Sequence, residues 1–120
     1  MQKRMKRPTA ADLADRLPLR PVACAVLAAL AQKPCTGIDI LEAVNATVPG
    51  HPLLGPGTLY RLLRELRQQD LIERSEPKEG SRDERHVPHT LTPLGAAVLD
   101  AEVARLRRTI SLAARGWQTT

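Results

Sequence analysis

The sequence predicts a mainly α-helical fold with a small β-hairpin, and three patterns support this class. Apolar residues recur at helical spacing over most of the 120-residue chain. After residue 70, two short stretches on either side of a charged segment alternate as strands do. A last helical pattern then continues to about Arg115. We therefore expect several helices, a hairpin and a long C-terminal helix.

Composition limits both the size of the core and the class of partner. The chain is 42% hydrophobic but has no Phe, one Trp and one Tyr, so Leu, Val, Ile and Ala must build one modest core. The net charge of +5 permits a polyanionic partner. Residues 1–8 carry four of the positive charges without any apolar period, which predicts a basic disordered tail; they are Lys3, Arg4, Lys6 and Arg7.

Other patterns argue against membrane, metal and redox roles. The apolar run 21–31 is too short to span a bilayer and no cleavage site follows it. Cys24 and Cys35 have no Cys or His at ligand spacing, so we expect no metal and no cofactor. Reduced thiols are the expectation, with a redox-sensing pair as the alternative. These features predict a soluble cytoplasmic protein.

Capping residues and prolines bound the first helices. Thr9 and Thr36 each precede an Asp by three residues, which predicts helices beginning after both threonines. Between them, a helix over 21–32 ends at Lys33-Pro34. The inward residues expected in these helices are Leu13 and Leu17 in the first, Val22, Ala23, Val26, Leu27 and Leu30 in the second, and Ile38, Leu41, Val44 and Val48 in the third.

The stretch 55–72 predicts a helix with two distinct faces. Leucines at helical spacing form an apolar stripe, and Pro56 suits the first turn. The opposite side presents polar groups suited to the major groove of DNA. The apolar residues are Leu59, Leu62, Leu63 and Leu66, and the polar side carries Gly57, Tyr60, Arg61, Arg64 and Gln68.

The C-terminal third predicts a hairpin and a long helix. Strands are expected over 71–76 and 85–91, with Pro88 confining the second to an edge or bulge. Thr92-Pro93 begins a helix that Gly116 should end. This order is a winged helix-turn-helix with an N-terminal helix over 9–91, followed by a C-terminal dimerisation helix over 92–117.

An apolar seam on the last helix favours a dimer. Its residues step by four and three, as in a coiled coil, while Leu94 and Val98 lie off the seam and face the winged domain. The alternative is that the helix folds back on the N-terminal helix of its own chain. The seam residues are Leu99, Val103, Leu106, Ile110, Ala113 and Trp117.

Three sequence blocks resemble the PadR-like transcriptional regulators. Residues 55–72 are similar to the family's Ser-Pro-Gly-Thr-Leu-Tyr, amphipathic helix and Gly-Leu-Ile, with Asp70 in place of the last glycine. Residues 36–40 resemble His-Gly-Tyr-Glu-Ile, and 91–95 resemble Leu-Thr-Pro-x-Gly. The resemblance implies a DNA-binding repressor of the short subclass, which dimerises through one C-terminal helix. It also implies aromatic effectors at the dimer interface, where Trp117 is the only aromatic available.

Each candidate DNA contact has a physical role. Gly57 and Thr58 would place free N–H groups near a phosphate, although Thr58 alternatively caps the helix. Arg61 and Arg64 suit guanine edges, and the Tyr60 hydroxyl suits a phosphate unless that residue is structural. Gln68 and Arg67 are expected at the DNA backbone or in solvent. In the wing, Lys78 and Arg82 supply positive charge, and His86 and His89 point to opposite faces, which argues against a metal.

The function predicted is a homodimeric, sequence-specific DNA-binding transcriptional regulator acting on a pseudo-palindromic operator. The alternative is a winged-helix protein-interaction module that does not bind DNA specifically. An enzyme is not expected, because we find no nucleophile with a base and Gly55-Pro56-Gly57 lacks the lysine of a P-loop. The expected partners are double-stranded DNA and a second copy of the chain.

Overall fold

The computed structural model describes residues 8–75 and 85–118. It is mainly helical with one two-stranded antiparallel hairpin, which is the winged helix fold predicted from the sequence. The elements in order are α1 (Ala10–Ala14), α2 (Pro21–Gln32), α3 (Gly37–Asn45), α4 (Pro56–Gln68), β1 (Ile72–Arg74), β2 (His89–Leu91) and α5 (Pro93–Gln118).

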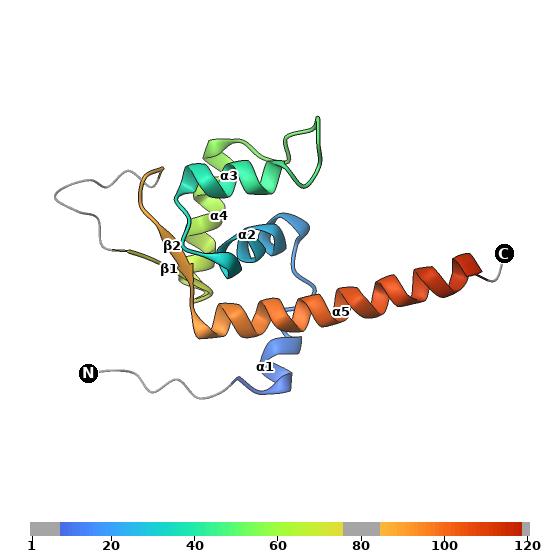
Figure 1. Cartoon of the computed structure of the whole chain (residues 1–120). Coiled ribbons are helices and arrows are strands. Elements are labelled where there is room, and N and C mark those ends of the chain that lie inside the picture. The colour runs from blue at the N-terminus through green and yellow to red at the C-terminus, as the bar shows by residue number, and fades with distance from the viewer. Residues whose placement is uncertain (1–7, 76–84, 119–120) are drawn as a thin grey trace.

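The helix α2 lies at the centre of the domain. It packs on α3, on β2 and on the first part of α5, while α4 contacts α3 and β1. In Figure 1 the hairpin stands at one end, and α5 runs beneath α2 and continues well beyond the other elements. The short helix α1 packs on α5. Aliphatic side chains form the core, as the near-absence of aromatic residues requires.

The predicted starts of α1 and α3 are confirmed. Thr9 and Asp12 form a complete capping box at α1, in which each side chain accepts a hydrogen bond from the other residue's backbone N–H. Thr36 and Asp39 do the same at α3. The bounds of α2 match the prediction, and its inward residues are buried except Val22, which is half-buried. Among the described residues no helix is both long and apolar enough to cross a membrane.

The predicted inner face of α3 is right for Val44 and Leu41, which pack in the core, but wrong for Ile38 and Val48. Ile40 and Val44 are fully buried, whereas Ile38 is 41% exposed and Val48, beyond the helix end, is 38% exposed. The sequence holds apolar residues on two neighbouring faces, both at helical spacing. The packing of Gly37 against the domain, where Gly37 is buried, selects the face that carries Ile40.

The hairpin is shorter than predicted and gains a third partner. Ile72 pairs with Leu91 and Arg74 with His89, and residues 76–84 lie outside the described part. Cys35, from the link between α2 and α3, forms a bridge with His89: the Cys35 N–H donates to the His89 carbonyl at 3.1 Å, and the reverse bond is 2.8 Å long. The base of the wing is thereby joined to the helical core.

The start of α5 packs directly against the backbone of Leu71. The Thr92 hydroxyl accepts from the Gly95 N–H at 2.9 Å and donates to the Asp70 carbonyl, so Thr92 caps the helix as predicted. A Cβ at Gly95 would overlap the carbonyl oxygen of Leu71. Gly116 does not end α5, which continues to Gln118. A glycine within an exposed helix weakens it without breaking it.

Candidate nucleic-acid interface

The helix α4 is anchored on one side and open on the other. Its four leucines are all buried. At about 100° per residue, Gly57, Arg61, Arg64 and Gln68 fall within roughly 60° of one another on the opposite side, and all four are exposed. The structure therefore brings these predicted residues onto one outward face, which we call the outer face of α4.

One flank of α4 is closed by the hairpin. Tyr60 is half-buried and packs against the core, so it lies at the edge of the outer face. Arg67 was expected to meet DNA or solvent, but its Nη1 lies 3.2 Å from Nε2 of His89. His89 itself is fully buried in β2, whereas His86 is exposed. The spacing of residues in the sequence could not reveal the Arg67–His89 contact. The two residues are 22 positions apart and lie on different elements, α4 and β2.

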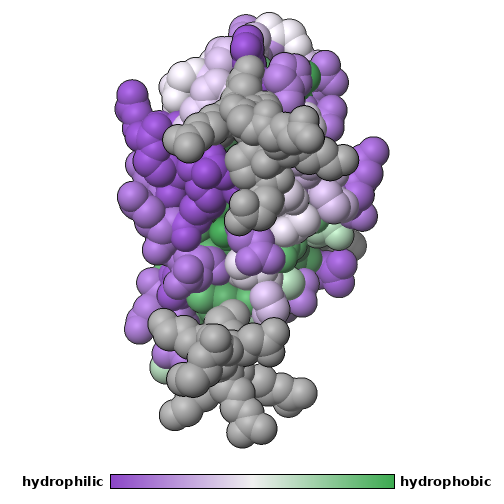
Figure 2. Space-filling model, turned by 90° about the vertical axis from the view of Figure 1, so that its left-hand side faces the viewer, coloured by the Kyte–Doolittle hydropathy of each residue, from purple (hydrophilic) through white to green (hydrophobic). Residues whose placement is uncertain are grey.

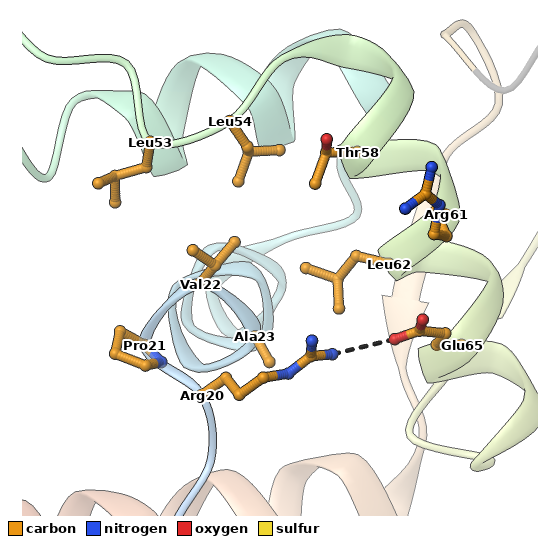
Figure 3. A pocket seen from close by; sticks show the side chains of 10 residues that line it. All are labelled: Arg20, Pro21, Val22, Ala23, Leu53, Leu54, Thr58, Arg61, Leu62 and Glu65. Carbon is orange, nitrogen blue, oxygen red and sulfur yellow. Dashed lines mark hydrogen bonds and ion pairs between the residues drawn. The ribbon is translucent and has the colours of Figure 1, made fainter.

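The other flank of α4 faces the start of α2. Glu65 accepts a hydrogen bond from the Arg20 guanidinium at 3.0 Å, an ion pair on the surface (Figure 3). Contacts on both flanks thus leave the outer face as the side of α4 turned away from the domain.

Asn45 positions the N-terminal end of α4. Its Oδ1 accepts from the backbone N–H of Leu53 at 2.8 Å and of Leu54 at 3.1 Å, and its Nδ2 donates to the Leu54 carbonyl. One side chain therefore ties the long connection before α4 to the end of α3. Gly55 is the N-cap and no side chain caps the helix, so the capping role considered for Thr58 is not observed.

The C-terminal end of α4 is closed by backbone hydrogen bonds. Leu71 N–H donates to the Leu66 carbonyl and Asp70 N–H to that of Arg67, both at 3.0 Å, which is a Schellman motif. Asp70 has a φ of 60°, the left-handed conformation that this motif requires. The turn directs the chain from α4 straight into β1.

The wing is described only at its base. Lys78 and Arg82 lie outside the described residues, so their predicted role stays a prediction. Figure 2 looks onto this end of the molecule. Strongly hydrophilic residues gather on the left of the view, and a smaller hydrophobic area lies beside them near the middle.

The predicted seam of α5 divides into two parts. Leu99 is buried and Val103 packs against the core of its own chain, as do Val98 and Leu94. Only the distal part is open: Leu106 is 36% and Ile110 63% exposed. Leu99 and Val103 are therefore packed within their own chain. Packing within the chain is what the alternative of a folded-back helix predicts for these two residues. Ala113 is exposed, and the side chain of Trp117 lies outside the described part.

Sequence reasoning missed Glu102, a buried acid on α5. It is 1% exposed, accepts a hydrogen bond from the Leu19 N–H at 2.7 Å, and pairs with Arg105. The hydrogen bonds from Arg105, opposed by burial, hold the pKa of the Glu102 carboxyl below its usual value. The available signal was its place at helical spacing from Leu99 and Leu106, but its partner Leu19 is 83 positions away in sequence.

The two cysteines are free thiols. Cys35 is buried and Cys24 half-buried. Burial raises the pKa of both thiols, which keeps them protonated and lowers their reactivity. Within the described ranges, no group of three His, Cys, Asp or Glu residues is arranged to hold a metal ion.

Comparisons with solved structures show the same fold. A PadR family transcription regulator from Clostridium difficile R20291 matches with a TM-score of 0.68 and 21% identity, over 82% of this chain and 99% of that one. Lactococcus lactis ZitR, described as a zinc-responsive MarR family member, matches at 0.63 and 23%, over 87% of this chain and 65% of that one.

A structure of wild-type ZitR in complex with DNA also matches, with a TM-score of 0.60 and 22% identity. This chain covers 87% of its own length there but 64% of the ZitR chain, so it spans less than two thirds of that protein. No curated protein matches the sequence. The model of the transcriptional regulator PadR-like family matches residues 26–101, well over half of the chain. The chain therefore belongs to the PadR-like family of transcriptional regulators.

Proposed function

We propose that this protein is a homodimeric, sequence-specific DNA-binding transcriptional repressor that uses α4 as its recognition helix. The observation that carries the proposal is the outer face of α4, which exposes two arginines and an amide while four buried leucines hold the helix in the domain. Membership of a transcriptional regulator family supports the same role.

The outer face of α4 has the chemistry needed to read DNA. Arg61 and Arg64 lie nearly one turn apart, and each guanidinium suits the O6 and N7 acceptors of guanine. At the start of the helix, exposed Gly57 and Thr58 leave backbone N–H groups open to a phosphate. Gln68 would meet the backbone at the far end. Lys78 and Arg82 would bring the wing to a neighbouring phosphate.

The dimer is proposed to form through the distal part of α5. Leu106, Ile110 and Ala113 share one side of the helix and are exposed to solvent in the monomer. A two-fold axis there would present two copies of α4 to one side of a duplex, which implies a pseudo-palindromic operator with half-sites about 34 Å apart. Residues 9–91 would then bind DNA and 92–117 would dimerise. The DNA complex of ZitR, which shares the fold, supports such a use of the winged helix.

Selection of bound sequences from random duplex DNA, followed by fluorescence anisotropy, tests the proposal. We expect one enriched sequence with two-fold symmetry. Arg61→Ala and Arg64→Ala should each weaken specific binding about tenfold or more, equivalent to about 1–3 kcal/mol. Arg107→Ala, an exposed arginine on α5, is the matched control and should bind as the parent does. Parent-like affinity in both α4 variants would refute the recognition-helix assignment.

Salt separates this function from the alternative of a protein-interaction module. Phosphate contacts release counterions, so the affinity for the selected duplex should fall steeply and log-linearly as salt rises. A chain that enriches no sequence and shows no such dependence would be the interaction module.

A further inference from the structure

A pocket opens beside the outer face of α4, between that helix, the start of α2 and the connection that Asn45 holds. Its volume is about 420 Å³, within the range of small-molecule sites. Figure 3 shows its side chains converging from all three elements. Those that line it are Arg20, Pro21, Val22, Ala23, Leu53, Leu54, Thr58, Arg61, Leu62 and Glu65.

The walls of the pocket are aliphatic. Val22, Leu54 and Leu62 point into it, and Leu53 lies at its mouth with 39% of its surface exposed. No aromatic side chain is among the lining residues, so a flat ring would find nothing to stack on. An occupant would therefore be held mainly by burial of an aliphatic body.

The three charged residues at the rim, Arg20, Arg61 and Glu65, have a net charge of +1. Arg20 and Glu65 pair with each other at 3.0 Å and largely cancel. Arg61 makes no ion pair or side-chain hydrogen bond among the described residues, and it lies at the end of the pocket next to Thr58. The methyl group of Thr58 points into the pocket, and its hydroxyl lies at the rim (Figure 3). A guanidinium with free donors is well matched to a single carboxylate, which it binds in bidentate fashion.

We propose that this pocket binds an aliphatic monocarboxylate whose head pairs with Arg61 and Thr58 and whose chain lies against Val22, Leu53 and Leu62. A second consequence rests on the proposed function. Arg61 is a base-reading residue of α4, and its guanidinium cannot grip a carboxylate and a guanine at the same time. Occupancy of the pocket would therefore release the operator, and the ligand would act as an inducer at the recognition helix itself.

Calorimetric titration of the full-length protein with sodium octanoate, without DNA and below the concentration at which octanoate forms micelles, tests the site. We expect saturable binding of one octanoate per chain. Arg61→Met should weaken it about tenfold or more, the value typical of a charged hydrogen bond. 1-Octanol should bind more weakly than octanoate by a similar factor, since it cannot engage the guanidinium as an anion.

Leu53→Ser tests the aliphatic wall without touching a proposed DNA contact. It should weaken octanoate binding about fivefold through lost apolar burial. Val48→Ser is the matched control, because Val48 is 38% exposed on the same connection but does not line the pocket; it should bind octanoate as the parent does. Absence of saturable binding, equal binding of octanol, or an unaffected Arg61→Met variant would overturn the site. Tighter binding of benzoate than of octanoate would overturn the aliphatic class.

Operator binding then tests the regulatory consequence. Saturating octanoate should lower the affinity of the parent and of Val48→Ser for the selected duplex, and the duplex should lower octanoate affinity by the same factor. Leu53→Ser should bind the duplex normally but respond only at higher octanoate. Operator binding that persists unchanged on an octanoate-saturated protein would refute the inducer role alone. Octanoate binding by a chain that enriches no DNA would refute the proposed function and leave the pocket standing.

Discussion

The two halves of α5 follow one apolar repeat but meet different surroundings. In the proximal half, Val98 and Leu99 are buried in the core, and Glu102 is hydrogen-bonded to the segment before α2. In the distal half, Ile110 is 63% exposed, and Figure 1 shows the helix continuing past every other element. A periodic apolar stripe predicts that one face of a helix is buried. It does not predict whether the same chain or a second copy covers that face.

Four predictions test this difference, and the largest effect is expected in the distal half. Leu106→Glu together with Ile110→Glu places two charges on the exposed side of α5 that we assign to the dimer. Each replaces about 1.5–3 kcal/mol of apolar burial with an unpaired charge, so the dimer dissociation constant should rise at least a thousandfold. Sedimentation velocity should show a monomer with an unchanged far-UV circular dichroism spectrum.

Leu112→Glu is the matched control for this double variant. Leu112 is 64% exposed, like Ile110, but it lies roughly 160° away around the helix. It should therefore leave the dimer intact. A parent protein that is monomeric, or a Leu112→Glu variant that dissociates as the double variant does, would show that the distal stripe is not the dimer interface.

The proximal half should respond through stability instead. Gly95→Ala places a Cβ against the Leu71 carbonyl oxygen, where only backbone movement makes room. We expect the free energy of unfolding to fall by about 3 kcal/mol, measured by urea denaturation. Gly57→Ala, with open space around the glycine, should cost nothing measurable. Equal stabilities for the two variants would mean that α5 does not seat on the end of α4.

Glu102 should make the proximal half sensitive to acid. Glu102→Gln removes the charge that Arg105 and the Leu19 N–H bind, at a cost of about 2 kcal/mol at neutral pH. The folded-state pKa of Glu102 lies below its ordinary value of 4.5, so its stabilising effect is complete above that pH and is lost as the pH falls through the folded-state pKa.

The variant should accordingly converge toward the parent as the pH falls through that acidic range, measured by thermal unfolding across pH. Glu65→Gln, which breaks only the exposed pair with Arg20, should change stability by less than about 0.5 kcal/mol. A constant gap between Glu102→Gln and the parent at all pH values would contradict the assignment of the effect to this carboxylate.

The smallest effect is expected at the turn between α4 and β1, against which the proximal half of α5 packs through Gly95. Asp70 holds a φ of 60°, which glycine adopts without strain. Asp70→Gly should raise the free energy of unfolding by about 0.5 kcal/mol. Gln69→Gly, at a φ of −88°, should lower it instead, so opposite signs at neighbouring positions report the left-handed turn.

Local patterns made most of the fold predictable. The capping boxes at Thr9 and Thr36 and the cap at Thr92 depend on residues three apart, so the sequence alone contains the whole interaction. The leucine face of α4 was equally clear, because the opposite face is polar and no second apolar stripe competes with it. On α3 two apolar faces compete, and only packing decides between Ile38 and Ile40.

The features that sequence reasoning missed all depend on distant partners. Arg67 reaches His89 and Glu102 reaches Leu19, and neither pair has a spacing that a helix or strand would reveal. The pocket beside Arg61 is missed for the same reason, since α2 and α4 meet there only after folding. The outer face of α4 needed no distant partner, which is why its residues could be named in advance.

The contact of Gly95 with Leu71 gives the length of α5 a further consequence. Because its backbone packs directly on Leu71, where α4 turns into β1, the start of α5 is fixed relative to α4. From Gly95 to Leu106 the helix advances roughly 16 Å. In a dimer joined beyond that point, the separation of the two half-sites would be set by helix length. Each residue inserted into this stretch would also turn each copy of α4 by about 100° about its own α5, relative to the dimer interface. The choice of operator would then depend on two things. The number of residues in this segment would set the spacing of the half-sites, and the side chains that read the bases would set their sequence.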